Sequence, residues 1–191
     1  HDVTAPAMVI TTTTADVTTG STTNDGTIAY VFTAGQATTN FVKADITVTG
    51  GSLGDLTGVS STVYTATFTP SGDGATSVAV AAGTFTDAAG NDNTVSNTFA
   101  WTFDSVGPTM TITSSTVDSG DTSKDATIAL TFTSNEATTT FAAEDISVTN
   151  GAITDFTADG GSTTVYTATF TPTGEGAATI DVAVNKFTDA S

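Results

Sequence analysis

Residues 62–75 read TVYTATFTPSGDGA, and residues 164–177 read TVYTATFTPTGEGA. In both copies apolar or aromatic residues alternate with threonine, a pattern typical of a strand with one buried and one solvated face. In the first copy Tyr64, Ala66 and Phe68 share the face that we expect to be buried. The phrase therefore predicts a half-buried β-strand that occurs twice in one chain.

The repetition extends well beyond this phrase. Thr27–Thr33 returns as Thr127–Thr133, and Thr86–Ala88 returns as Thr188–Ala190. The period of about 100 residues is the length of a domain and too long for a solenoid unit. The 191 residues therefore predict two domains, residues 1–103 and residues 104–191.

Turn residues interrupt the alternation at intervals typical of a sandwich and predict seven strands in the first domain. The expected strands are 7–13, 27–33, 45–50, 53–58, 62–69, 75–85 and 94–103. The second domain is expected to have strands at 109–115, 127–133, 145–150, 153–158, 164–171 and 177–187. The predicted fold class is all-β, with two tandem immunoglobulin-like Greek-key β-sandwiches that lack an inter-sheet cysteine pair.

The second copy stops early, because Ser191 aligns with Ala89. We expect the second domain to lack the strand that corresponds to 94–103, and so to expose a sheet edge. Disorder, proteolysis, a shortened chain and strand donation from a neighbouring molecule are alternative explanations. The connection around Pro108 is short, so we expect the two domains to be arranged end to end.

The charge is strongly negative, with 20 acidic residues against three lysines and a net charge of −17. Such a surface repels nucleic acid phosphates and anionic lipids, which argues against both partners. No apolar run approaches the length that spans a membrane, so we expect no direct membrane insertion. The acidic residues either increase solubility or bind cations.

The chain offers no catalytic set. It has no cysteine, and His1 is its only histidine. Paired carboxylates such as Glu144 and Asp145 are sequence neighbours, and adjacent residues of a strand point to opposite faces. We therefore predict that the protein is not an enzyme.

The topology of a seven-strand sandwich places several acidic residues at one pole of the second domain. Carboxylates that converge there repel one another unless a cation lies between them. Ca²⁺ takes six to eight oxygen ligands, and carboxylates provide such oxygens. Soft transition metals prefer thiolate and imidazole ligands, which are missing from this set of residues. The residues that this topology gathers are Asp104, Asn135, Glu136, Glu144, Asp145 and Asp189.

The first domain has a matching pole with Asp2, Asp45, Asp87 and Asn91. It has Gln36 where the second domain has Glu136, so we expect a weaker or missing site there. The alternative for Asp87–Asn91 is a turn without a metal, because Asp, Gly and Asn all favour turns.

Several motifs occur in the same order in both copies. In the second copy they are Asp-x-x-x-Pro-Thr from 104, Phe-x-Ser-Asn-Glu from 132, Phe-x-x-x-Asp-Ile-x-Val-x-Asn-Gly from 141, Tyr-Thr-Ala-Thr-Phe-Thr-Pro from 166 and Phe-Thr-Asp-Ala from 187. This pattern resembles the bacterial Ig-like repeats of giant secreted surface adhesins of the RTX or biofilm type. The resemblance implies a secreted, cell-surface filament in which each repeat packs against neighbouring repeats of the same polypeptide. It also implies Ca²⁺ at domain junctions. By the match of motifs, the resemblance implies ligand roles for Asp104, Glu136, Asp145 and Asp189 in the second domain and for Asp2, Asp87 and Asn91 in the first.

We therefore expect a structural extender, or spacer, of a large bacterial adhesin involved in cell adhesion and biofilm. Two alternatives stay open: a module that binds a glycan or a host protein, and an accessory domain of a secreted carbohydrate-active enzyme. Tyr30, Tyr64, Tyr166 and Trp101 all fall on predicted inward faces, whereas glycan sites usually expose aromatic side chains.

Overall fold

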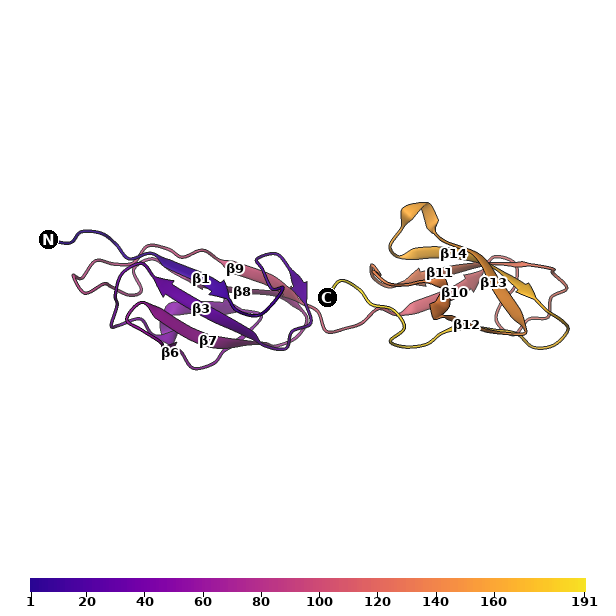
Figure 1. Ribbon diagram of the computed structural model, residues 1–191, viewed down its shortest axis with the longest axis horizontal. Coiled ribbons are helices and arrows are strands. Elements are labelled where there is room, and N and C mark those ends of the chain that lie inside the picture. Colours follow the sequence, from indigo (N-terminus) through magenta and orange to yellow (C-terminus); the bar gives the residue numbers. More distant parts are fainter. The chain divides into compact units, whose positions relative to one another are not determined.

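The computed structural model describes residues 1–191, which form two compact units, His1–Ser105 and Val106–Ala190. Both are all-β, as predicted (Figure 1). The helical segments are three single 3₁₀ turns: η1 (Lys43–Asp45), η2 (Ala143–Asp145) and η3 (Asp159–Gly161). None of the helical segments has the length and apolar character needed to cross a bilayer.

The first domain is a sandwich of two sheets. One sheet has the order β1 (Met8–Thr12), β3 (Ile28–Ala34), β7 (Val63–Pro70) and β5 (Gly51–Leu53), and β6 (Thr57–Gly58) also pairs with β7. The other has the order β2 (Thr22–Thr23), β9 (Phe99–Phe103), β8 (Gly74–Val80) and β4 (Ile46–Thr49). All pairs are antiparallel except β2 with β9, which is the immunoglobulin-like arrangement.

The core of the first domain lies between these sheets and follows from the alternation in the sequence. Tyr30 and Phe32 of β3 and Phe68 of β7 are almost completely buried, whereas the intervening threonines of β7 face outward. The rings pack edge to face, for example Tyr30 on Phe68 with centroids 6.2 Å apart. Burial of these large aromatic side chains is the main favourable contribution to folding.

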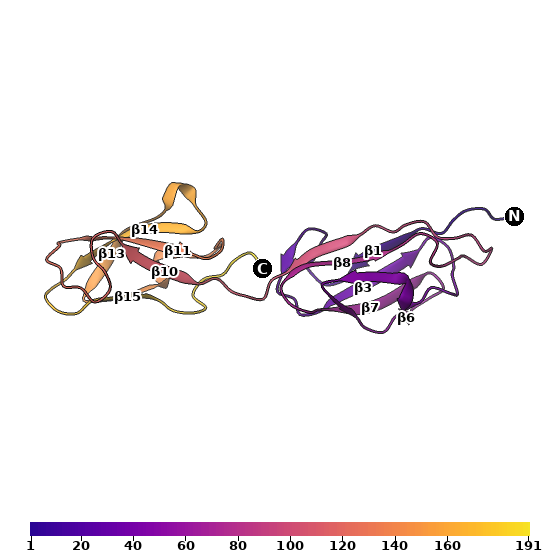
Figure 2. The same ribbon diagram turned by 180° about the vertical axis from the view of Figure 1, so that it is seen from behind.

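The second domain repeats the first sheet in full. Its strands are β10 (Met110–Ser114), β11 (Ile128–Ser134), β14 (Val165–Pro172) and β13 (Gly151–Ala158), in that order. Its other sheet has only β12 (Ile146–Thr149) and β15 (Thr179–Val182), and Figure 2 shows the domain from the opposite side. Phe132 and Phe170 are buried, like their counterparts in the first domain.

The predicted strands 75–85, 94–103 and 177–187 were too long. In the first domain β8 ends at Val80 and β9 begins at Phe99. The buried carboxamide of Asn93 is the cause, because its Oδ1 accepts hydrogen bonds from the N–H groups of Thr84 and Phe85 and its Nδ2 donates to the carbonyls of Ala81 and Thr94. These side-chain bonds replace strand pairing. In the second domain β15 ends at Val182.

Two further expectations differ from the structure. The predicted strand 53–58 is split into β5 and β6, whereas its counterpart β13 is continuous with a bulge between Thr154 and Thr157. The short strand β2 was not predicted. Its two residues carry no alternating pattern, and it exists because the N–H of Thr102 and the N–H of Asp104 donate to the Ser21 and Thr23 carbonyls.

Asn97 closes the outer edge of β1 in the first domain. Its side-chain oxygen accepts a hydrogen bond from the Ile10 N–H at 2.8 Å, and its Nδ2 donates to the Ile10 carbonyl at 2.9 Å. One carboxamide therefore satisfies both backbone groups that a neighbouring strand would otherwise bind.

Candidate metal centre

Glu136 and Asp189 lie close together in the second domain. Glu136 follows the end of β11, Asp189 follows the loop after β15, and both are half-buried. Their carboxylates each present an oxygen within 4.8 Å of the other. The two residues come from opposite sheets, so it is the sandwich fold that brings them together.

Neighbouring polar groups hold this pair in place. The side-chain oxygen of Asn135 accepts a hydrogen bond from the Thr109 N–H at 2.6 Å, and its Nδ2 donates to Oε1 of Glu136 at 3.3 Å. The hydroxyl of Thr139 donates to the backbone carbonyl of Asp189 at 2.8 Å. Two carboxylates at this separation repel each other, and a hard cation with oxygen ligands would relieve that repulsion.

Asp145, unlike Glu136 and Asp189, closes a backbone turn. Its Oδ2 accepts a hydrogen bond from the Ala142 N–H at 2.9 Å and so closes the 3₁₀ turn η2. Asp45 does the same for η1, with Oδ2 2.8 Å from the Val42 nitrogen. The turn therefore accounts for an aspartate at this position in both domains, and a ligand role for Asp145 stays a prediction.

Asp104 directly follows β9, and its N–H donates to the Thr23 carbonyl at 3.1 Å. This bond continues the parallel pairing of β2 with β9 by one residue. The backbone of Asp104 is thus positioned by the first domain, and the metal-ligand role of its side chain stays a prediction.

In the first domain Asp87 is at the centre of a hydrogen-bonded turn. Its Oδ1 accepts from the N–H groups of Ala89 and Asn91 at 2.8 and 2.9 Å, and its Oδ2 accepts from Nδ2 of Asn91 at 2.8 Å. The Asn91 side chain, helped by these backbone N–H groups, lowers the pKa of the Asp87 carboxyl below its ordinary value. The turn explains both residues without a metal.

Gln36 makes the first domain different from the second at this pole. Its Nε2 donates to the Thr4 carbonyl at 2.6 Å, and the Thr4 N–H donates to Oδ1 of Asp2 at 2.9 Å. Nδ2 of Asn91 also approaches the Asp2 and Thr4 carbonyls, at 3.3 and 3.4 Å. The first domain therefore has the amide of Gln36 where the second domain has the carboxylate of Glu136.

The role of the Thr4 carbonyl was not predicted. No residue type in a sequence identifies a backbone oxygen as an acceptor. The fold brings the amides of Gln36 and Asn91 to this carbonyl in the N-terminal segment. The ligand roles of Asp2, Asp87 and Asn91 stay predictions.

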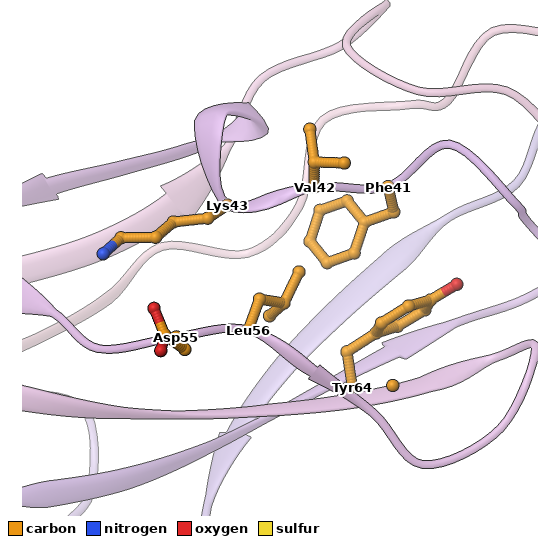
Figure 3. Close-up of a pocket in the computed structure, with 7 residues that line it drawn as sticks. Phe41, Val42, Lys43, Asp55, Leu56 and Tyr64 are labelled. Carbon is orange, nitrogen blue, oxygen red and sulfur yellow. The ribbon is translucent and has the colours of Figure 1, made fainter.

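A shallow groove of about 470 Å³ lies on the first domain. Phe41, Leu56 and Tyr64 line its apolar end, and Lys43 and Asp55 lie at the other end (Figure 3). The second domain has Phe156 in place of Leu56, and this ring stacks on Tyr166 at 5.6 Å and contacts Phe141 at 5.4 Å. In the second domain a larger ring therefore lies against the counterparts of Phe41 and Tyr64.

Together, the paired sheets and the repeated motifs define the class of protein as a tandem of immunoglobulin-like β-sandwiches. The chain belongs to the bacterial Ig-like domain family, whose model matches residues 2–103 and again residues 104–191. No curated protein matched the chain. Domains of this family are typically non-catalytic and often extracellular or surface-associated.

Proposed function

We propose that the two domains are extender repeats of a large bacterial cell-surface adhesin and that they separate a distant binding module from the cell. The observation that carries this proposal is the tandem repetition of one Ig-like domain. The large aromatic side chains of this domain lie in its core. Trp101 and Tyr30 are 3% and 1% exposed, so neither can stack on a sugar. A spacer needs a stable repeated fold and no binding surface of its own.

We further propose that Ca²⁺ binds the second domain through Glu136 and Asp189, with Asp104 and Asp145 as additional ligands. The proximity of the Glu136 and Asp189 carboxylates supports this, as does the excess of acidic residues over lysines. In this proposal the ion stiffens the connection between successive repeats. The first domain binds Ca²⁺ weakly or not at all, because Gln36 presents an amide where the second domain has the carboxylate of Glu136.

Calcium titration tests the metal proposal. A ligand at one hundred times its Kd stabilises the folded state by about 2.7 kcal/mol, which raises the Tm of a domain of this size by roughly 10–20 °C. We expect this rise in the transition of the second domain and its reversal by EGTA. Glu136→Gln should remove most of it, because it converts the site to the Gln36 arrangement.

Glu175→Gln is the matched control, since it removes the same charge from an exposed turn before β15. It should leave the calcium effect unchanged. Equal losses in both variants, or no calcium effect in the wild-type chain, would contradict the proposed site. Small-angle scattering with Ca²⁺ and with EGTA tests the spacer role separately, because a calcium-stiffened connection should give a narrower distribution of interdomain distances.

A ligand-binding module is the second candidate, and the groove on the first domain is the observation that favours it. Leu56→Phe introduces the ring that the second domain has at Phe156 and should abolish binding of any glycan or peptide in the groove. A glycan array probed with the wild-type chain and with this variant separates the two functions. Binding that is lost in the variant would favour the module over the spacer.

A further inference from the structure

Residues 150 and 151 form the only Asn-Gly pair among the eight asparagines of the chain. In such a pair the backbone nitrogen of the glycine can attack the side-chain amide of the asparagine, because glycine has no Cβ to hinder the approach. The pair lies between β12, which ends at Thr149, and β13, which begins at Gly151. The sequence therefore places a chemically reactive asparagine in the turn between two strands.

The backbone of Asn150 has a conformation that most residues avoid. Its φ is 51°, in the left-handed region that glycine and asparagine tolerate best. In the first domain the same position is Gly50, with a φ of 71°. The turn thus accepts either residue, but only in the second domain does a side-chain amide stand next to a glycine nitrogen.

The nitrogen of Gly151 takes no part in the pairing of β13 with β14. The Asn150 carbonyl accepts a hydrogen bond from the Thr173 N–H at 3.1 Å, so this carbonyl points toward the end of β14. The C=O and N–H groups of one trans peptide point in opposite directions. The N–H of Gly151 therefore points away from β14, and no bond of that ladder holds it.

The side chain of Asn150, in contrast, is bound at both of its polar atoms. Its Oδ1 accepts a hydrogen bond from the Thr173 hydroxyl at 3.2 Å, and its Nδ2 donates to the Gly174 carbonyl at 3.1 Å. Both partners follow directly after β14. The bonds hold the amide carbon, Cγ, on the side of β14, so the side chain must leave them before Cγ can meet the Gly151 nitrogen.

We propose that Asn150 is a site of spontaneous deamidation and that its bonds to Thr173 and Gly174 limit the rate in the folded second domain. The Gly151 nitrogen gives its proton to hydroxide and forms a bond to Cγ of Asn150. The bond from Cγ to Nδ2 breaks, and Nδ2 takes up a proton from water and leaves as ammonia. Water then opens the resulting succinimide ring at either carbonyl and leaves aspartate or isoaspartate at position 150.

The two products differ in their effect on the fold. Both add a negative charge, and isoaspartate also adds one methylene group to the main chain. The main chain has little room here, because a Cβ on Gly151 would overlap the ring of Phe170 and the carbonyl of Thr171. Isoaspartate should therefore weaken the pairing of β13 with β14 and lower the Tm of the second domain. The first domain has Gly50 and is spared.

Incubation of the full chain at mildly alkaline pH, followed by peptide mass spectrometry, tests the proposal. Deamidation adds about 1 Da, and fragmentation spectra distinguish isoaspartate from aspartate. We expect Asn150 to react before the other asparagines, and roughly tenfold faster in urea than in the folded chain, because unfolding removes its bonds. Asn150→Gly reproduces the residue of the first domain and should remove both the reaction and the loss of Tm that accompanies it.

Two valine variants isolate the role of the Thr173 hydroxyl. Thr173→Val removes the donor to Oδ1 and should speed deamidation of the folded chain about fivefold. Thr171→Val makes the same change at an exposed position of β14 and should leave the rate unchanged. In urea the wild-type chain and both variants should react at one rate, which shows that the variants do not alter the chemistry of the Asn-Gly pair itself.

Three results would overturn the proposal. The first is earlier reaction of another asparagine in the folded chain, and the second is an equal rate at Asn150 in the folded and unfolded chains. The third is an equal effect of Thr173→Val and Thr171→Val on the folded chain. The calcium and spacer proposals do not depend on any of these outcomes.

Discussion

The indole N–H of Trp101 donates a hydrogen bond of 2.9 Å to the hydroxyl of Tyr30, and this bond joins the two sheets of the first domain. Both residues are buried. Replacing Tyr30 by phenylalanine keeps the ring and removes the acceptor. An unsatisfied buried donor costs about 1–3 kcal/mol, so we expect Tyr30→Phe to lower the free energy of unfolding of the first domain by that amount.

Urea unfolding of Tyr30→Phe, Trp101→Phe and the double variant measures this coupling. The double variant should be less destabilised than the sum of the single variants, because it removes donor and acceptor together. Additive losses would contradict a hydrogen bond between the two residues.

The same tyrosine makes the first domain sensitive to high pH. Burial raises the pKa of Tyr30 from its ordinary value of 10.0 to about 12. Between these values the unfolded chain loses the phenolic proton while the folded domain retains it, so stability falls as pH rises from about 10 to about 12. The urea midpoint of the wild-type domain should fall more steeply over this range than that of Tyr30→Phe. Parallel curves would contradict the raised pKa.

Gly51 has no room for a side chain. A Cβ at this position would overlap the ring of Phe68 and the carbonyl of Thr69. Overpacking of this kind costs about 1–3 kcal/mol, so Gly51→Ala should lower the Tm of the first domain by several degrees. At Gly26 a Cβ would meet nothing within 4 Å, and Gly26→Ala in thermal unfolding is the control. A similar Tm for both variants would be inconsistent with this packing.

Asn93 holds the loop between β8 and β9 through four hydrogen bonds to backbone groups at 2.8–3.0 Å. Asn93→Ala should cost about 3 kcal/mol, because several buried backbone groups lose their partners. Asn93→Asp keeps the acceptor but places a carboxylate oxygen beside the Ala81 and Thr94 carbonyls. Chemical denaturation should find this variant destabilised at pH 7 and partly restored at pH 3, where the carboxyl group is protonated.

Asp87 makes the first domain sensitive to acid. Its pKa is lowered by the Asn91 side chain and by backbone N–H groups, so the stabilisation is present above the ordinary pKa of 3.8 and is lost as pH falls through the lower folded value. We expect Asp87→Asn to destabilise the domain at pH 7 and to make little difference at pH 2. Circular dichroism across an acid titration measures both. A constant difference between the variants would contradict the prediction.

The two middle strands of the first sheet, β3 and β7, were predictable, because alternation alone identifies them. The expected 27–33 and 62–69 differ from β3 and β7 by a single residue at each end. The loop around Asn93 was not predictable in the same way, since a buried carboxamide that replaces strand pairing resembles an ordinary turn residue in the sequence. Period-two patterns report burial, and they carry no information about which polar side chains bond to the backbone.

The candidate site was predictable to a similar extent. The predicted sandwich topology placed Glu136 and Asp189 at one pole, and in the structure their carboxylates lie close together. The substitution of Gln36 for Glu136 marked the first domain as different, but its consequence depends on the Thr4 carbonyl, which no residue pattern reveals. The use of Asp45 and Asp145 to close 3₁₀ turns was also hidden, because an aspartate that closes a turn and one that binds a cation look alike in a sequence.

The Asn97 carboxamide on Ile10 has a consequence for any polypeptide that contains many such domains. Copies with nearly the same sequence, crowded along one chain, can exchange strands with their neighbours and become trapped in misfolded pairs. A side chain that occupies both backbone groups of Ile10 blocks this exchange without a proline or a surface charge. Identical repeats can then fold next to one another, each with its own strands.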